Sequence, residues 1–343
     1  MKKIIAIILA FVMLMSFAAC SASPATTEAL SNAPSEENVS DVKTTDDGDN
    51  KFLVGLAFGA LDLTPQILSE NIIAICKEKG WEYTMTNADQ DPSKLLSDVE
   101  SLCQLGCDVI CVRGITDDSI TPIQEACKEA GIPLIALSVV DQDGEYLTLC
   151  CDTTEAGAAA CAEWYAQYIQ DHPEQEYNAG FVVGDYSFEA ALCRWTYVRD
   201  VDGSNELANG EANWGAPNAM TLVEDWIKTY PEMNVIGSSS DEMTVGVIQA
   251  LQDAGKSPDD YIVMSYDALD IMQDYILEGW CDASVGLDLE KHARTVCDIL
   301  QKVKDGDTSS VEKLTKAYSI WMCTSENLQD ILDGKAEIVY YEY

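Results

Sequence analysis

Positive charge is scarce in this chain of 343 residues, which has 20 lysines and arginines against 59 aspartates and glutamates. The formal net charge is −39, and so acidic a chain is repelled by the phosphates of nucleic acids and by anionic lipids. We therefore exclude nucleic acid as a partner. Because an acidic surface also serves solubility, the charge names no other partner.

Histidine is nearly absent, since only His172 and His292 occur, and the sequence contains no Cys-x-x-Cys pair. A structural zinc or haem site is therefore not expected, and we predict no metal and no cofactor. Catalytic motifs are lacking as well. The segment 255–257 (GKS) resembles the end of a phosphate loop, but Ala250 stands where that loop needs glycine, and the segment ends a helical pattern. No Gly-x-Ser-x-Gly elbow and no distinctive carboxylate pair occur, so we predict that the protein is not an enzyme.

Cysteine, by contrast, is abundant, with 13 in the chain. Most fall in helical patterns or apolar strand-like runs where a small apolar residue would serve, namely Cys76, Cys103, Cys111, Cys127, Cys150, Cys161 and Cys297. We interpret these as small buried hydrophobic residues. The adjacent Cys150 and Cys151, and the four-residue spacing of Cys103, Cys107 and Cys111, leave a disulfide or a thiol site open.

The longest apolar run, 4–15, is too short to span a bilayer. It follows Lys2 and Lys3 and precedes the segment 17–20 (FAAC), which predicts a signal peptide over 1–20. The segment resembles the bacterial lipobox, in which the cysteine, here Cys20, carries the lipid that anchors the mature protein to the cell membrane. The alternative is an ordinary secreted protein with Cys20 as a spare thiol. Either reading places the protein outside the cytoplasmic membrane.

Residues 21–50 contain almost no large apolar side chain and consist mainly of Ser, Thr, Ala, Pro, Asn, Asp and Glu. Such a segment cannot bury enough surface to fold, so we predict a disordered tether. Thirty flexible residues span on the order of 30 Å. A tether of that length lifts a folded part clear of the membrane while keeping it near a membrane partner.

The remaining part, 51–343, alternates short apolar runs with amphipathic segments, a pattern typical of parallel sheets covered by helices. Strands are predicted at 52–58, 81–86, 108–113, 132–137, 147–151, 179–184, 235–238 and 261–266, and helices at 65–79, 92–105, 119–130 and from Thr153, with Asp152 as its cap. Such a length is too great for one core. The predicted fold is α/β, with two doubly wound parallel-sheet lobes.

Several segments occur in the order and spacing of one protein family. They are DPSKLLSDV (91–99), EAGIPLI (129–135), YPEMNV (230–235), DEMTVG (241–246), ALQDAGKS (250–257) and TSENL (324–328). Through them the chain resembles type I periplasmic binding proteins of the ribose and galactose kind, over nearly all of 51–330. The resemblance implies two lobes that close around a ligand, the first comprising 51–150 plus 288–312 and the second 151–287 plus 313–343, joined by a multi-strand hinge.

The resemblance also implies a function. Such a protein captures a small polar solute, a sugar or sugar derivative, and delivers it as a monomer to the permease of an ABC importer. The alternative is a sensory module that presents the same kind of solute to a membrane receptor kinase, and a neighbouring permease gene or kinase gene would distinguish the two. A cytoplasmic regulator is disfavoured, because the N-terminus carries an export signal in place of a DNA-reading helix pair.

The resemblance gives roles to individual positions. Arg194 would fork two hydrogen bonds onto ligand oxygens, and Asp267 would accept from hydroxyls; for both the alternative is a surface salt bridge or a helix cap. Trp214 and Phe58 would stack on an apolar ligand face or serve ordinary packing. The complete set of predicted ligand-binding residues is Phe58, Asp62, Thr64, Arg113, Ser138, Arg194, Trp214, Ser240 and Asp267.

The chain departs from the family pattern at several of these positions. Ser138 and Val139 stand where sugar binders have aspartate and arginine, Ser240 stands where asparagine is common, and Leu287 replaces a polar amide. The loop 61–65 (LDLTP) lacks the aromatic pair of many relatives. These departures put a simple pentose or hexose in doubt.

Arg113 points to a different ligand chemistry. It ends the third predicted strand, where relatives often have an uncharged residue, and the chain has only four arginines. If Arg113 and Arg194 both face the cleft, the ligand carries a carboxylate, a phosphate or another acidic group. A structural pairing of Arg113 with Asp117 or Asp118 is the alternative.

Overall fold

The computed structural model describes residues 51–114, 119–138, 144–150, 154–315, 317 and 320–341. The predicted signal peptide with Cys20, the predicted tether, the predicted cap Asp152 and the two aspartates near Arg113 lie outside the described residues. Residues 50–343 form one compact unit. Within the described part, no helix is both long and apolar enough to cross a membrane.

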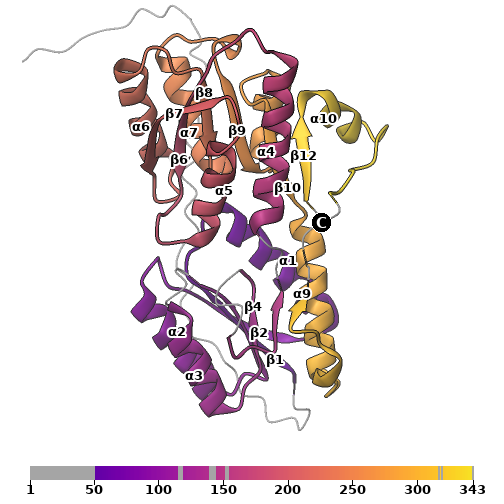
Figure 1. Cartoon of the computed structure of the whole chain (residues 1–343). Helices are drawn as coiled ribbons and strands as arrows, with labels where there is room; N and C mark the ends of the chain where they lie inside the picture. Colours follow the sequence, from indigo (N-terminus) through magenta and orange to yellow (C-terminus); the bar gives the residue numbers. More distant parts are fainter. Residues whose placement is uncertain are drawn as a thin grey trace, which may run out of the picture. The chain divides into compact units, whose positions relative to one another are not determined.

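The first sheet has six strands in the order β11-β5-β4-β3-β1-β2, and all their pairings are parallel. Its strands are β1 (Leu53–Phe58), β2 (Glu82–Asn87), β3 (Val109–Arg113), β4 (Leu134–Ala136), β5 (Thr148–Cys150) and β11 (Leu314–Thr315). Its helices are α1 (Leu63–Lys79), α2 (Pro92–Leu105), α3 (Thr121–Ala130) and α9 (Leu289–Lys304), with the short 3₁₀ helix η3 (Thr308–Ser310) following α9. Figure 1 shows these elements as the first lobe of the molecule.

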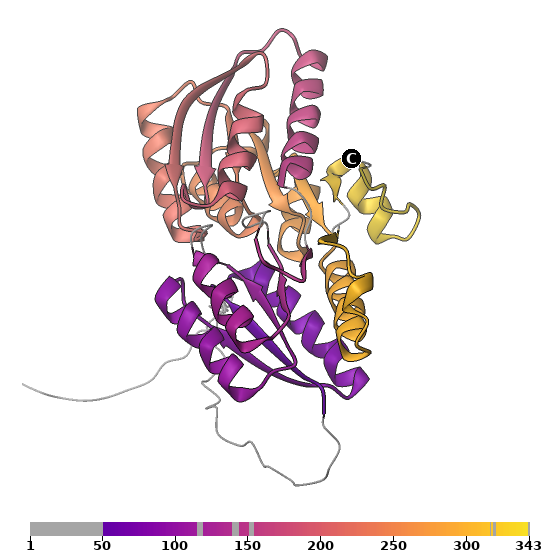
Figure 2. The ribbon, with the colours of Figure 1, turned by 60° about the horizontal axis from the view of Figure 1, so that its bottom comes forward.

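Alternation along the strands divides the core of the first lobe into two layers. In β1, Val54, Leu56 and Phe58 pack with α1 and α9, whereas Ala57 packs with α2 and α3. Successive side chains of a strand point to opposite faces of the sheet, so a strand buried on both faces contributes apolar side chains to both layers. Helices α1 and α9 lie side by side although they are far apart in the sequence (Figure 2).

The second sheet has the order β12-β10-β9-β8-β6-β7 and is parallel except for the edge pair β10 and β12. Its strands are β6 (Tyr177–Val183), β7 (Ser204–Glu211), β8 (Val235–Ser238), β9 (Ile262–Asp267), β10 (Ala283–Leu287) and β12 (Ile320–Thr324). Helices α4 (Thr154–Asp171) and α5 (Glu189–Arg199) share one core layer with the sheet, and α6 (Ala216–Thr229) and α7 (Asp241–Asp253) share the other. The elements α8 (Asp270–Leu277), α10 (Ser325–Leu332) and the 3₁₀ helix η2 (Pro258–Asp260) complete this lobe.

The chain passes between the two sheets three times, after β5, after β10 and after β11. The third passage differs from the predicted boundary between 312 and 313. Leu314 and Thr315 pair with Leu149 and Cys150 in the first sheet, so the first lobe keeps the chain as far as Thr315. The multiply connected two-lobed α/β fold is therefore the predicted one, with this shift of a few residues.

Most predicted elements agree with the structure to within a few residues. Helix α2 has the predicted bounds because its end signals are strong: the Asp91 carboxylate accepts from the backbone N–H of Ser93 and Lys94, and Gly106 ends the helix in the left-handed conformation. Strand β6 begins earlier than predicted, at Tyr177, whose side chain is buried against α4.

The cysteines predicted as buried helix residues occupy such positions. Cys76, Cys127, Cys161 and Cys297 are free and buried in helices, and Cys103 is half-buried. Burial raises the pKa of Cys161 and Cys127 to about 12, so both remain protonated thiols at neutral pH.

Candidate functional site

Three strands of the first sheet end at the same level. Phe58 is paired in register with Asn87 on one side and with Arg113 on the other, so the carboxyl ends of β1, β2 and β3 form one edge. Ser138 follows β4 at the same edge. In open α/β sheets this edge is where ligands bind, because loops and helix N-termini converge there.

The second sheet presents its own carboxyl edge through β8 and β9. Asp267 ends β9, and Ser239 and Ser240 follow β8. Ser240 is the N-cap of α7, and its hydroxyl oxygen accepts from the Met243 N–H at 3.3 Å. This edge therefore gathers one carboxylate and several small hydroxyls.

Two hydrogen bonds join the two edges. The Thr64 hydroxyl donates to Asp267 Oδ2 at 3.0 Å, and the Leu63 backbone N–H donates to Glu242 Oε2 at 3.4 Å. Leu63 and Thr64 form the first turn of α1, where unpaired N–H groups and the positive end of the helix dipole favour a carboxylate. The loop after β1 in one lobe thus meets the strand ends of the other lobe.

We call this meeting of Leu63 and Thr64 with Glu242 and Asp267 the junction. Arg194 reaches it from α5. Its Nη1 donates to the Ser239 carbonyl oxygen at 2.6 Å and lies 4.0 Å from Asp267 Oδ1, and its guanidinium carbon lies 4.7 Å from the centroid of the Tyr266 ring. The side chains of Arg194 and Asp267 are only 17% and 5% exposed. Arg194 and Asp267 are therefore largely buried at the junction. A surface salt bridge, one of the alternatives that the sequence left open, would leave both side chains exposed.

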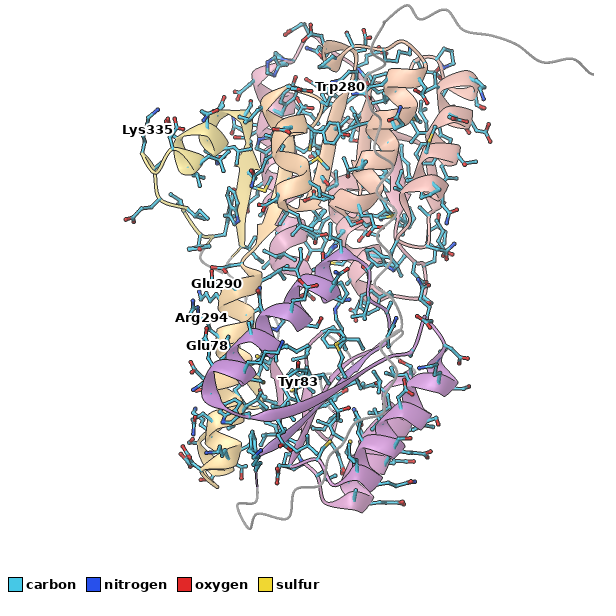
Figure 3. All side chains as sticks on the ribbon, turned by 180° about the vertical axis from the view of Figure 1, so that it is seen from behind. Glu78, Tyr83, Trp280, Glu290, Arg294 and Lys335 are labelled. Atoms are coloured by element: carbon cyan, nitrogen blue, oxygen red, sulfur yellow. The ribbon has the colours of Figure 1, made fainter. Side chains whose placement is uncertain are left out.

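The other arginines with ion pairs lie elsewhere. Arg294 on α9 pairs with Glu290 one turn earlier, and both side chains are exposed (Figure 3). Arg199 forms two hydrogen bonds with the neighbouring Asp200. Local partners already satisfy both, so neither is a candidate for a ligand.

The Arg113 backbone carbonyl accepts from the Gly59 N–H at 2.9 Å, but its guanidinium forms no ion pair or hydrogen bond with any residue that the structure describes. It is half-buried and follows the alternation of Val109 and Cys111, which places it on the α1 and α9 face of the sheet. Its charge opposes the rise that burial causes in the pKa of Asp267, and it adds to the lowering that burial causes in the pKa of His292.

Three carboxyl groups lie at or near the junction, those of Asp241, Glu242 and Asp267. Burial raises the pKa of Asp267, although the charge of Arg194 and the hydrogen bond from Thr64 oppose the rise. Burial and the nearby Asp267 together raise the pKa of Asp241 to about 8. Burial raises the pKa of Glu242 as well. Each of these shifts favours the neutral, protonated carboxyl group over the carboxylate.

A cavity of about 380 Å³ lies beside the junction. Its walls come from the loops after β1, β2 and β7 and from the start of α7, and its lining residues are Ala60, Leu61, Asp62, Asn87, Asp89, Gln90, Asn213, Trp214, Gly215 and Glu242. Three carboxylates and one large aromatic ring line it, and no lysine or arginine does. Such a lining suits a solute that offers hydroxyl hydrogens and one apolar face.

Trp214 is held firmly at this cavity. Its backbone and that of Asn213 have left-handed φ values of 58° and 47°. Its ring lies so close to Gly184 that a Cβ there would come within 2.5 Å of the indole, and it contacts the edge of Phe188 at 6.2 Å between centroids. One side of the ring is therefore packed, and the half-buried remainder borders the cavity.

The structure brings most of the predicted residues together and leaves Phe58 apart from the rest. Thr64, Arg194 and Asp267 meet at the junction, Asp62 and Trp214 line the cavity, and Ser240 caps α7 beside them. Phe58 instead lies fully buried in the core layer with Leu68 and Ile72, where its ring packs against apolar side chains. Ser138 is 8% exposed, and its Oγ has no hydrogen-bond partner among the described residues.

Sequence reasoning assigned no role to Asp241, Glu242, Asn87 and Asp89. Asp241 and Glu242 stand directly after Ser240 and read as ordinary acidic residues of a first helical turn. Asn87 carried the better signal, because it ends a strand whose neighbours end in Phe58 and Arg113. Among the described residues, no group of three or more His, Cys, Asp or Glu side chains is placed to hold a metal ion.

Two parallel-sheet lobes, connected three times and facing each other through their carboxyl edges, define the class of two-lobed α/β binding folds. The chain belongs to the periplasmic binding protein domain family, whose pattern it matches over residues 65–308. Within that family it is a type I periplasmic binding protein of the ribose kind.

Relatives and solved structures agree with this assignment. The chain is 23% identical over 230 residues to the ribose import binding protein of Bacillus subtilis (strain 168), covering 66% of this chain and 73% of the relative. The ribose import binding protein of Escherichia coli (strain K12) is 20% identical over 247 residues, covering 70% and 77%.

Solved structures share the fold. An ABC transporter solute binding protein from Bacillus halodurans C-125 with bound myo-inositol has a TM-score of 0.74 and 22% identity, covering 84% of this chain and all of that one. A protein from Mycobacterium smegmatis in complex with β-D-fucofuranose has a TM-score of 0.76 and 19% identity, covering 83% and 95%.

Proposed function

We propose that the chain is an extracytoplasmic solute-binding lipoprotein of an ABC importer, which binds a small polar solute between its lobes and delivers it to the permease without chemistry. The observation that supports this best is the junction itself. Thr64 of one lobe donates to Asp267 of the other, so closure of the lobes and the ordering of a binding carboxylate occur at the same place.

The residues at the junction suit a hydroxyl-rich solute such as a sugar or sugar derivative. Asp267 and Asp62 would accept hydrogen bonds from hydroxyls, and Arg194 would donate to ring or hydroxyl oxygens. Ser138 has a buried hydroxyl without a described partner, which a solute would satisfy. Trp214 would cover an apolar face.

Relatives support this solute class. Two are named for ribose import, and solved structures of the same fold hold myo-inositol and a furanose. Cys20 as the lipid attachment site and the tether 21–50 would hold the binding unit at the membrane, where the permease lies.

A thermal-shift screen of the purified full-length protein tests the proposal. The panel would comprise pentoses, hexoses, inositols, uronic acids, sugar phosphates, nucleosides and amino acids. A solute present at about a thousand times its Kd stabilises the folded state by about 4 kcal/mol, which gives a large rise in Tm. Hits among sugars or inositols would support the proposal, and a panel without any hit would contradict it.

Arg113 favours a second candidate, an acidic solute. A half-buried arginine whose guanidinium has no described partner, at the same strand edge as the unsatisfied Ser138 hydroxyl, suits a carboxylate or a phosphate. The three carboxylates of the adjacent cavity oppose a fully anionic solute, so the acidic group would have to lie at Arg113 itself.

Arg113→Ala separates the two candidates. For an acidic solute, affinity would fall at least tenfold, whereas a neutral sugar would lose much less. Arg294→Ala, which removes an exposed and locally paired arginine, is the matched control. Unchanged affinity in Arg113→Ala for the solute found in the screen would remove the acidic candidate.

A further inference from the structure

A buried polar network lies directly behind the junction. Asp241 Oδ1 accepts from the hydroxyls of Ser265 at 2.6 Å and Ser284 at 2.9 Å, and its Oδ2 accepts from the Leu269 N–H at 2.6 Å. The Ser284 hydroxyl oxygen also accepts from the Ala268 N–H at 3.0 Å. One carboxylate of α7 thereby ties together β9, β10 and the turn that follows β9.

That turn has a conformation that its residues rarely adopt. Asp267 has a φ of 104° and Ala268 a φ of 48°, and neither is glycine. Positive φ values at residues with a side chain persist only where the surroundings hold them. The backbone N–H groups of Ala268 and Leu269, which follow Asp267, both donate to this network. Ser284 accepts from Ala268, and Asp241 accepts from Leu269.

Asp241 itself cannot touch a solute. Asp241, Ser265 and Ser284 are all 0% exposed. Asp267, one residue before the clamped N–H groups, does reach the junction through Thr64 and Arg194. The network therefore acts on the binding edge only through the position of Asp267.

We propose that Asp241 is a positioning residue, which holds the turn at 267–269 so that the Asp267 carboxylate points into the junction. The inference rests on the proposed function, because it assigns to Asp267 the role of a solute-binding group. It adds a buried residue that no solute contacts and on which affinity nevertheless depends. Ser284 is its partner, since its hydroxyl links Asp241 to the turn.

Hydrogen exchange of the turn amides tests the positioning directly and needs no solute. In Asp241→Ala the amides of Ala268 and Leu269 should exchange at least tenfold faster than in the wild type. Asp241→Asn should restore most of the protection, because its amide oxygen can still accept from Leu269. Ser284→Ala is a milder variant should Asp241→Ala not fold, and it should expose Ala268 alone.

The matched control is Asp282→Ala. Asp282 is also an aspartate of this sheet that accepts a backbone N–H, that of Val263 at 2.8 Å, but it precedes β10 at the opposite end of the strands. It should lower stability and leave the amides of the turn protected. Equal exchange at 268–269 in Asp241→Ala and in the wild type would overturn the inference.

Titration calorimetry with D-ribose and myo-inositol as probes tests the consequence for binding. For whichever probe the wild type binds, Asp241→Ala or Ser284→Ala should weaken affinity about tenfold, which corresponds to roughly one hydrogen bond between the solute and Asp267. Asp282→Ala should leave the affinity unchanged. In an Asp267→Asn background the additional effect of the Asp241 substitution should disappear, because both act through one carboxylate. Additive losses would overturn the inference. If the wild type binds neither probe, the proposed function loses support, and the exchange result still decides the role of Asp241.

Discussion

At the scale of single residues, Arg194 makes three contacts that a lysine cannot make together. It donates to the Ser239 carbonyl, stacks on the Tyr266 ring and lies beside Asp267. A planar guanidinium can do all three at once, whereas an ammonium group is a compact point donor. The orientation of Arg194 therefore depends on its shape as well as on its charge.

Arg194→Lys is therefore expected to weaken solute binding about tenfold, or about 1.4 kcal/mol. Arg199→Lys, on the same helix but paired with Asp200 at the surface, should leave affinity unchanged. Calorimetric titration of both variants with one solute measures this. Equal affinity in the two variants would contradict the assigned role of Arg194.

Asp241 makes stability depend on pH. Its folded-state pKa of about 8 lies above the ordinary value of 3.8, so the folded protein keeps this proton at a pH where the unfolded chain has lost it. Stability from this group is therefore greatest at low pH and is lost as the pH rises through about 8. His292, whose pKa burial lowers to about 4, is neutral in the folded state throughout this range, and its contribution is the same in a variant that changes only Asp241.

Between pH 6.5 and 8.5 the Tm of the wild type is expected to fall. The fall should be clearly smaller in Asp241→Asn, which cannot titrate. Thermal unfolding monitored by circular dichroism at several pH values measures both slopes. Parallel slopes in the two proteins would show that Asp241 does not titrate in this range.

The site could be predicted from the sequence only at residues that carry a local signal. Asp267 and Arg194 stand near strand ends in segments that resemble the family, and the structure brings them together. The bond from Thr64 to Asp267 joins residues 203 positions apart, and no local pattern encodes it. The role proposed for Asp241 depends on Ser265 in β9 and Ser284 in β10. The sequence around Asp241 does not reveal that these serines lie beside it.

At the scale of elements, periodicity and end signals were sufficient for eight strands and for helices α1 to α4, whereas no bounds were predicted for β7, β10 and β12 or for α5 to α10. Helix α2 has Asp91 before it and Gly106 after it, and its bounds match the prediction. Strand β11 was missed, because two residues, of which Leu314 is 42% exposed, carry no periodicity. It exists because the edge of β5 pairs with it.

The contact between α6 and α7 depends on the absence of a side chain at Gly246. A Cβ there would lie 2.0 Å from the backbone oxygen of Ala216, at the start of α6. Backbone cannot yield as the end of a flexible side chain can, so the helices would have to separate. This contact fixes the start of α7, which carries Asp241 and Glu242.

Gly246→Ala is therefore expected to lower the free energy of unfolding by about 1–3 kcal/mol. Gly157→Ala, inside α4, is the control. Its Cβ would meet Val285 at 3.4 Å, an ordinary contact, so the change should be neutral or stabilising by up to about 1 kcal/mol. Urea unfolding of both variants measures the difference, and equal midpoints would contradict the packing argument.

At the scale of the whole molecule, three passages between the sheets connect two lobes whose proposed binding groups face each other. Each passage is short, and multiple short connections restrict the relative motion of two bodies to bending about a hinge. A solute that bridges the edges would bind the closed arrangement better than the open one and so shift the population toward it. A permease partner, as proposed, would then distinguish the loaded from the empty protein.

Lipid anchoring makes a separate prediction for the N-terminus. Cys20→Ala should move the protein from the membrane fraction and the detergent phase to the aqueous phase, because the acyl chains would have no attachment site. Solute affinity should remain unchanged, since the proposed binding residues lie in 51–343. Detergent-phase partitioning of cell extracts measures this. A wild-type protein found only in the aqueous phase would favour ordinary secretion.

The most direct measurement is a calorimetric titration of the wild-type protein and of Asp267→Asn with the solute that gives the largest thermal shift. The account predicts one-to-one binding by the wild type and an affinity at least tenfold weaker in the variant, because Asp267 is the carboxylate on which both lobes converge. Equal affinities in the two proteins would place the binding site away from the junction and contradict the account.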